Sequence, residues 1–259
     1  MIKKIGIPVL ISLLIIGLCY SLIYVPFINS KNDYVIINDK DIFKITNNKW
    51  TKINKRNINR LSFSNSYSLI GDKFIGKTYL NSNKDNFEIY DSAYQKIDAT
   101  DTLITLNTKK EIEDIKIAKQ YNAFDDVDMQ NVNNILKRYS LDDENFSVTL
   151  KYITDLNNDG EDDIIYSISN FYDQDNRSKA FSLIFSSINN NIEMIDEVIV
   201  DSADEYSTST IYLKSVLDID QDNNYELIIS NASYGNDNNC YSIYRYDTGS
   251  NSFKKLIGC

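Results

Sequence analysis

The chain contains no histidine, and only two prolines, eight glycines and three cysteines stand among its 259 residues. The lack of histidine excludes Ser-His-Asp hydrolysis, Cys-His proteolysis and every histidine-ligated metal site. There is also no GxSxG motif, no glycine-rich phosphate-binding loop and no CxxC pair, which removes further classes of enzyme and redox site. With so little glycine and proline, we expect Asn, Asp and Ser to form the turns.

Positive charge is scarce in the second part of the chain. Residues 1–110 carry 16 Lys/Arg and 9 Asp/Glu, a balance of +7, whereas residues 111–259 carry 11 and 28, a balance of −17. An acidic surface repels phosphate, so this composition argues against nucleic acid as a partner. The same surplus of carboxylates favours a metal cation.

The N-terminus holds a long stretch without charge, because residues 5–28 contain no charged side chain. A helix of about 20 residues crosses a bilayer, and Lys3 and Lys4 before the run predict a cytoplasmic N-terminus. We expect residues 1–30 to form a cytoplasmic tip and an uncleaved transmembrane signal anchor, which makes the chain a single-pass cell-membrane protein. A cleaved signal peptide and lipidation at Cys19 are the alternatives, and all three place the domain outside the cytoplasm.

An extracytoplasmic domain permits disulfides, and Cys240 and Cys259 are the candidates there. The sequence between them reads as a hairpin with Gly249-Ser250 as its two-residue turn. In that register Cys240 faces Cys259. The sequence therefore predicts a cross-strand disulfide, with two free thiols as the alternative.

Short β-branched or aromatic runs bounded by Asn, Asp and Ser predict strands along most of the chain. In the first part these runs are residues 34–38, 41–45, 49–53, 61–70 and 87–90. One helix is predicted from Asp126 to Tyr139, where four apolar residues follow the i, i+3, i+4, i+7 spacing. Residues 110–119 fit either a helix or a strand.

Four hairpin-like segments show a weak internal repeat. Three of them end in an aromatic residue, a variable residue, Lys and an aliphatic residue, beginning at Trp50, Tyr94 and Phe253. The four segments are residues 41–53, 87–97, 181–195 and 241–257. At face value they indicate four similar β units, although any half-exposed hairpin favours the same pattern.

Two acid-rich stretches lie between apolar strand sequences, and their oxygen-bearing side chains recur at the same four loop positions. Positions 1, 3, 5 and 9 are Asp155, Asn157, Asp159 and Asp163 in TDLNNDGEDDIIYS, and Asp218, Asp220, Asp222 and Glu226 in SVLDIDQDNNYELIIS. Oxygens at this spacing on a tight loop converge, and several carboxylates a few ångströms apart repel one another without a cation. Ca²⁺ takes six to eight oxygen ligands, so the spacing predicts two calcium sites, with solvated acidic turns as the alternative.

The remaining loop positions fit the same interpretation. Position 7 would supply backbone carbonyls, from Glu161 and Asn224, and position 6 needs a left-handed backbone, which Gly160 and Asn223 tolerate. EF-hands are excluded, because neither loop has Glu at position 12 and both are flanked by strand sequences rather than helices. The second loop has four carboxylates against three and an amide, so we predict the tighter site there.

These two stretches resemble the FG-GAP/VCBS-type calcium-binding repeats of integrin-like β-propellers, in which a D-x-D-x-D-G-x-x-D loop joins two blade strands. The resemblance covers about residues 146–259, and the second copy departs from the pattern with Asn for Gly and Glu for the last Asp. It implies a mainly β fold of propeller-like or incomplete propeller blades, with one helical insertion and structural Ca²⁺. We divide the chain after the anchor into an N-terminal β-hairpin region, residues 33–110, and the helix with two calcium-loop repeats, residues 111–259.

The resemblance also implies adhesion or ligand recognition. We expect a membrane-anchored extracytoplasmic binding module that is not an enzyme, held in the membrane through residues 5–28. Its partner would be a surface protein or a glycan, because exposed members of the nineteen tyrosines suit both. An extracytoplasmic enzyme acting on glycans through paired carboxylates and an accessory subunit of an envelope complex are the alternatives.

Overall fold

The structure is a computed structural model that describes residues 33–37, 41–53, 66–70, 73–83, 86–97, 103–107, 115–171, 179–201, 209–220, 222–233 and 240–259. The predicted membrane anchor lies outside these residues. In the part of the chain that is described, no helix combines the length and the apolar character needed to cross a bilayer. The described residues are mainly β, with the single helix α2 (Asp126–Arg138) at the predicted place.

Three antiparallel sheets contain all sixteen described strands. The seven-stranded sheet has the order β3-β2-β1-β7-β4-β5-β6, the five-stranded sheet β12-β11-β10-β9-β8, and the four-stranded sheet β13-β14-β15-β16. The first sheet uses β1 (Asp33–Ile37), β2 (Asp41–Thr46), β3 (Lys49–Lys52), β4 (Ser66–Ile70), β5 (Lys73–Asn83), β6 (Asn86–Tyr90) and β7 (Leu103–Asn107). The second uses β8 (Lys119–Tyr121), β9 (Val148–Thr154), β10 (Asp163–Ser169), β11 (Lys179–Ile188) and β12 (Asn191–Asp201). The third uses β13 (Ser209–Leu217), β14 (Glu226–Ser233), β15 (Cys240–Asp247) and β16 (Ser252–Ile257).

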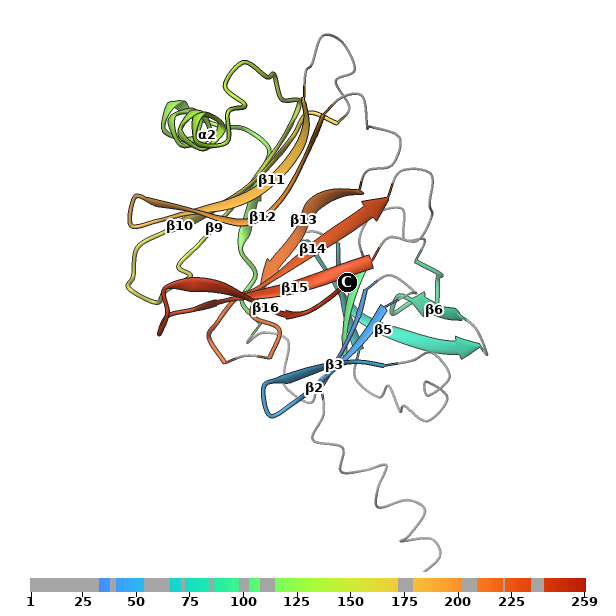
Figure 1. Ribbon diagram of the computed structural model, residues 1–259. Helices are drawn as coiled ribbons and strands as arrows, with labels where there is room; N and C mark the ends of the chain where they lie inside the picture. The colour runs from blue at the N-terminus through green and yellow to red at the C-terminus, as the bar shows by residue number, and fades with distance from the viewer. Residues whose placement is uncertain are drawn as a thin grey trace, which may run out of the picture.

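The helix and the sheets are stacked as layers, in the order α2, five-stranded, four-stranded, seven-stranded (Figure 1). One core lies between α2 and β10–β11, where Val132 and Ile135 meet Tyr166 and Phe185. The next joins the five-stranded to the four-stranded sheet, and the third joins the four-stranded to the seven-stranded sheet. The described strands form this stack and not a closed ring of blades.

The four-stranded sheet is apolar on both faces because it is the middle layer. Along β14, Leu227 and Ile229 belong to one core while Ile228 between them belongs to the other, which is the alternation that a strand imposes. A strand buried on both faces reads as a continuous apolar run. This explains why the run from Leu227 to Ile229, which follows the second acidic loop, has no polar residue at alternate positions.

Helix α2 is fixed to the five-stranded sheet by a buried polar network. Asp125 caps the helix and forms a capping box with Asp128. The carboxylate of Asp128 is buried, pairs with the buried ammonium of Lys151 on β9, and accepts a hydrogen bond of 2.9 Å from the Tyr166 hydroxyl on β10. Of the ambiguous residues 110–119, the structure describes 115–119, and none of these is helical. Ile117 forms a bridge with Leu217 at the end of β13, and Lys119 begins β8.

The C-terminal hairpin carries the disulfide between Cys240 and Cys259, whose Cα atoms lie 6.2 Å apart. The predicted register holds from Tyr244 to Asp247, and a bulge shifts it by one residue at Ile243. The predicted two-residue turn is wrong, because Asp247 pairs with Ser252 and residues 248–251 form a four-residue turn. Asn251 takes the left-handed conformation there (φ +49°), which a two-residue turn at Gly249-Ser250 does not require.

Candidate functional site

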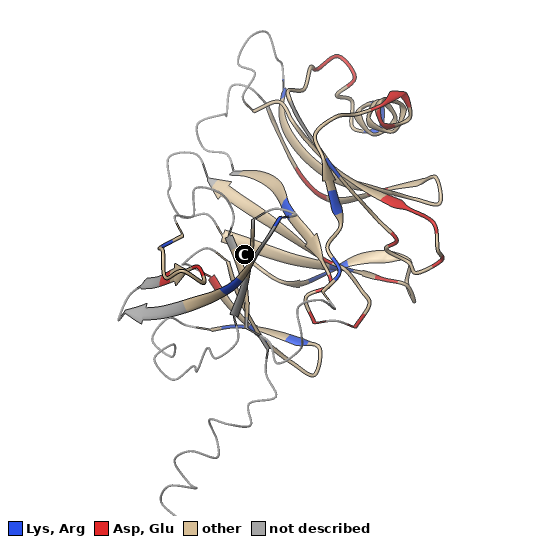
Figure 2. Ribbon diagram, turned by 180° about the vertical axis from the view of Figure 1, so that it is seen from behind, with Lys and Arg blue, Asp and Glu red and all other residues tan. Residues whose placement is uncertain are grey.

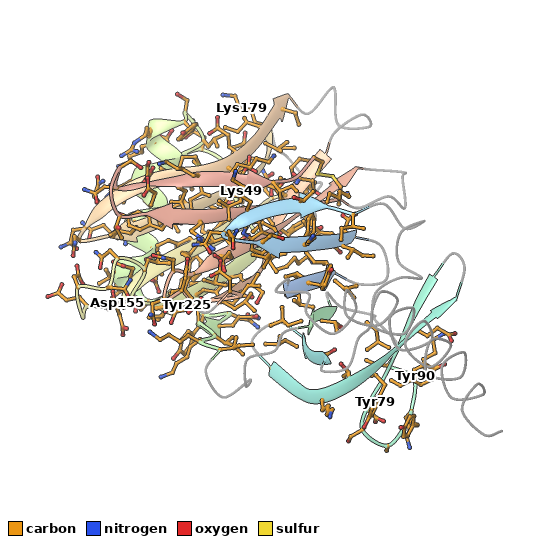
Figure 3. All side chains as sticks on the ribbon, turned by 90° about the horizontal axis from the view of Figure 1, so that it is seen from below. Lys49, Tyr79, Tyr90, Asp155, Lys179 and Tyr225 are labelled. Atoms are coloured by element: carbon orange, nitrogen blue, oxygen red, sulfur yellow. A yellow bond between two sulfur atoms is a disulfide. The ribbon has the colours of Figure 1, made fainter. Side chains whose placement is uncertain are left out.

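The two acidic loops occupy equivalent places in the fold. Residues 155–162 join β9 to β10, and residues 218–225 join β13 to β14. Both loops therefore connect the first two strands of a four-stranded antiparallel meander, and acidic residues gather at this end of both sheets (Figure 2). Asp155 and Tyr225 lie near each other at this edge (Figure 3).

The two loops share one pattern of hydrogen bonds, counting Asp155 and Asp218 as position 1. The position-1 carboxylate accepts bonds from the backbone N–H groups of positions 5 and 6, at 3.1 and 2.9 Å in the first loop and 3.0 and 3.0 Å in the second. The position-9 carboxylate of Asp163 or Glu226 accepts a bond from the N–H of position 2, at 2.9 and 2.8 Å. The position-5 carboxylate accepts a bond from the N–H of position 7, at 2.8 and 2.9 Å. Four matched bonds in two loops of different sequence indicate one local fold used twice.

The backbone at position 6 is left-handed in both loops, as the sequence predicts. Gly160 has φ +89° and Asn223 has φ +69°. The first loop has a second left-handed residue, Asn158 at position 4 with φ +61°. At position 2, Leu156 and Ile219 are buried and anchor the two loops in the cores below.

In the first loop, the side chains that donate hydrogen bonds to the carboxylates are amides. No basic residue among those described pairs with them. The Asp159 carboxylate accepts hydrogen bonds from Asn157 at 2.7 Å and from Asn189 at 3.1 Å. Asp163 is buried, and its desolvation raises its pKa to about 6 against the opposing bond from the Leu156 N–H. The nearby charges of Asp159 and Asp155 raise this pKa further, and no basic side chain among the described residues contributes to it.

In the second loop, the guanidinium of Arg245 on β15 binds three of the four carboxylates assigned to calcium. Its nitrogen atoms lie 2.6 Å from Asp220, 2.9 Å from Asp222 and 2.5 Å from Glu226. One carboxylate oxygen from each of Asp218, Asp220 and Asp222 lies within 4.8 Å of the others. The acidic side chains of this loop thus converge on a cation, and that cation is an arginine.

The pKa values in this cluster follow from burial and charge together. Burial raises the pKa of Glu226 well above its ordinary value and raises that of Asp220, while Arg245 opposes both shifts. Burial disfavours the charge of Arg245, yet the carboxylates of Glu226 and Asp220 hold the pKa of its guanidinium above the usual value. A buried guanidinium with several carboxylates is stable only when the hydrogen bonds are this well arranged.

Within the part of the chain that the structure describes, the first loop has no counterpart of Arg245. Glu226 pairs with Arg245 across β14 and β15, and the same register across β10 and β11 places Ile188 opposite Asp163. The prediction that the second loop binds calcium more tightly is based on the number of carboxylates and does not include Arg245. This arginine lies 19 residues beyond Glu226 and after residues 234–239, so no local sequence signal connects it to the loop.

The loops also touch each other and the seven-stranded sheet. Asn158 donates a hydrogen bond of 3.2 Å to the backbone carbonyl of Asn223, and Asn48 from the turn between β2 and β3 lies 3.4 Å from Asp222. A polar hollow of about 320 Å³ opens beside the second loop, and its lining includes Asn48, Asp222 and Arg245. Solvent ions can therefore reach this cluster.

Eight of the ten predicted ligand positions lie in these two loops, while Asp163 and Glu226 are the first residues of β10 and β14. All ten would offer oxygen as the donor atom, which Ca²⁺ prefers. Comparison of the chain with protein-family models, with curated proteins and with solved structures found no match.

Proposed function

We propose that this chain is a membrane-anchored extracytoplasmic binding module in which Ca²⁺ holds the first acidic loop and Arg245 holds the second. The observation that carries this proposal is the matched hydrogen-bond pattern of the two loops, together with the binding of the Arg245 guanidinium by the carboxylates of the second loop. The second loop binds a guanidinium, so we infer that this loop conformation is stabilised by a positive charge. The first loop offers oxygen ligands through which a metal ion would supply that charge. Asp155, Asn157, Asp159, Asp163 and the Glu161 carbonyl are the groups that would hold Ca²⁺.

The layered sheets support a kinship to FG-GAP/VCBS-type blades. Two consecutive four-stranded meanders pack face to face, and the first connection of each carries the acidic loop at the same edge. Blades of a propeller pack face to face in the same sense. We propose that residues 146–259 are two such blades of an incomplete propeller, with α2 and β8 inserted before the first.

A structural role for the cation favours binding over catalysis. The loop carboxylates accept hydrogen bonds from backbone N–H groups, from amides or from Arg245. These bonds fix the carboxylates around the cation of each loop. Rigid loops at one end of stacked sheets are a common way to present a ligand surface. The anchor at residues 5–28 and the cell-membrane location are part of this proposal and come from the sequence alone.

A thermal melt of the full chain in detergent tests the proposal. With a dissociation constant of about 10⁻⁴–10⁻³ M, about 10 mM Ca²⁺ adds about 1.4–2.7 kcal/mol to the free energy of unfolding. The melting temperature should then rise by several degrees over that in chelator, and Asp159→Asn should abolish the rise. Asp142→Asn, an exposed acid outside both loops, is the matched control. An unchanged melting temperature in the original chain would contradict the proposal.

A further inference from the structure

The ribbon formed by β5 and β6 carries a cluster of tyrosines on one face. Tyr79 and Tyr90 are directly paired across the two strands, and Glu88, two residues before Tyr90, lies on the same face. Tyr79 and Tyr90 lie close together on an arm that extends away from the stacked sheets, far from Asp155 (Figure 3). Tyr94, in the turn after β6, stacks on Tyr79 with the ring centroids 4.8 Å apart and 11° between the planes.

Tyr94 is held in an unusual conformation with its ring in solvent. Its side chain is 70% exposed, and its φ of +59° is a costly conformation for a bulky residue that is not glycine. The turn enforces it: Asp91 accepts side-chain bonds from the N–H groups of Ala93 and Gln95, both at 2.8 Å, and its backbone carbonyl accepts one from Tyr94 at 3.0 Å. Strain retained in this way is typical of ligand contacts.

The other members of the hairpin repeat use their aromatic residue differently. Trp50 packs edge-on against Phe43, and Phe253 packs edge-on against Tyr246, in each case against its own hairpin partner strand. Both of these rings are partly buried. Tyr94 alone of the three stacks face to face and keeps most of its ring exposed, so packing within its hairpin does not account for it.

The charged side chains near Tyr79 and Tyr94 form a hydrogen-bonded pair with no net charge. Glu88 accepts hydrogen bonds from the Tyr90 hydroxyl at 2.8 Å and from the Lys96 ammonium at 3.2 Å. These bonds, with the charge of Lys96, lower the pKa of Glu88, so the ion pair persists at neutral pH. The face therefore combines a flat aromatic ring with one carboxylate and one ammonium that cancel in charge.

We propose that Tyr94, stacked on Tyr79 and flanked by Glu88 and Lys96, is a platform that binds a neutral hexopyranose residue of a glycan. The C–H face of such a sugar carries partial positive charge and fits the electron-rich face of a tyrosine ring. Its equatorial hydroxyls can donate to the carboxylate and accept from the ammonium. The stack holds the ring in place before binding, which lowers the entropy lost on association.

The charge of this face separates a sugar from other ligands that stack on aromatic rings. A nucleic-acid strand needs unpaired basic groups for its phosphates, whereas the Lys96 ammonium lies against Glu88. A quaternary ammonium ion favours a cage of rings at angles to one another, whereas Tyr79 and Tyr94 are nearly parallel. This inference names a ligand class for the proposed binding function, and it uses no residue of the acidic loops.

Calorimetric titration of the full chain tests the platform, in a detergent without a sugar headgroup, with cellohexaose, chitohexaose and mannohexaose as probes. We expect at least one hexaose to bind at concentrations up to about 10 mM. Tyr94→Phe should keep this binding because it keeps the ring face, while Tyr94→Asn should weaken it at least about fivefold. Asn tolerates the left-handed backbone, so Tyr94→Asn should melt no lower than the original chain. Tyr121→Ala, an exposed tyrosine on β8, is the control.

The proposal is wrong if none of the three hexaoses binds, or if Tyr94→Asn binds as tightly as the original chain. A dimer that Tyr94→Asn dissociates, without sugar binding, would assign this face to a second copy of the chain. Each titration is repeated in calcium and in chelator. Sugar binding without any effect of calcium on stability would contradict the calcium proposal alone. Stabilisation by calcium without sugar binding would contradict the sugar platform alone.

Discussion

At the scale of single residues, the two acidic loops differ chiefly in their side-chain partners, which are amides in the first loop and the Arg245 guanidinium in the second. The spacing of ligands and the left-handed residues at position 6 could be predicted from the sequence, because both depend on neighbours within nine residues. Arg245 could not, because its place beside the loop depends on the pairing of β14 with β15. The predicted order of affinity of the two loops therefore has no support once this contact is known.

Replacing Arg245 should make the second loop depend on a metal ion. In Arg245→Gln, the three carboxylates of Asp220, Asp222 and Glu226 lose their basic partner, and we expect a loss of about 3–5 kcal/mol in the free energy of unfolding in chelator. Added Ca²⁺ should restore part of this loss. Urea denaturation with and without Ca²⁺ measures it, with Lys254→Gln as a control at an exposed pair, for which less than about 1 kcal/mol is expected. Equal losses in both variants would contradict the buried role of Arg245.

The left-handed residue of the first loop gives a prediction that is independent of metal. A Cβ at Gly160 would contact no atom within 4 Å, so Gly160→Ala costs only the backbone strain at φ +89°, about 1–2 kcal/mol. Gly249→Ala, whose backbone is not left-handed, should be neutral within about 0.5 kcal/mol. Denaturant midpoints compare the two. A Gly160→Ala variant as stable as the original chain would show that the loop relaxes to another conformation.

At the scale of secondary-structure elements, the helix and most strands were predictable and most of the exceptions have local causes. Helix α2 combines helical spacing with acidic residues at its start, and both signals act within the segment. Strand β5 was missed because Gly76 and several polar residues interrupt it. Strand β7 was also missed, although its sequence LITLN has the apolar and β-branched residues of a strand. The turn of the last hairpin was wrong because Asn251, not Gly249, supplies the left-handed residue.

The attachment of α2 to the sheet gives a prediction at this scale. Asp128→Asn should destabilise the chain by about 3–5 kcal/mol, because it leaves the buried Lys151 ammonium with only the exposed Asp125 carboxylate, 3.7 Å away, as a charge partner. The double variant Asp128→Asn/Lys151→Met should lose less than the sum of the two single variants. A double-mutant cycle from urea denaturation measures this coupling. Additive losses would show that the two side chains do not stabilise each other.

At the scale of the whole molecule, the stack of layers places both acidic loops and the turn between β2 and β3 along one edge. Contacts through Asn158 and Asn48 join these three segments, which lie far apart in the sequence. The mainly β class with one helix could be predicted, since it is a sum of local patterns. The order of the layers could not, because it depends on which apolar faces meet, and every strand of the four-stranded sheet offers apolar side chains to one or the other.

A calcium titration of the full chain by calorimetry tests the central claim most directly, because it counts ions as well as measuring affinity. The expected result is one Ca²⁺ per chain for the original sequence, none for Asp159→Asn and two for Arg245→Gln. Two ions bound to the original chain would contradict the role of Arg245 as the resident cation. No heat of binding in either the original chain or Arg245→Gln would contradict the assignment of these loops to calcium.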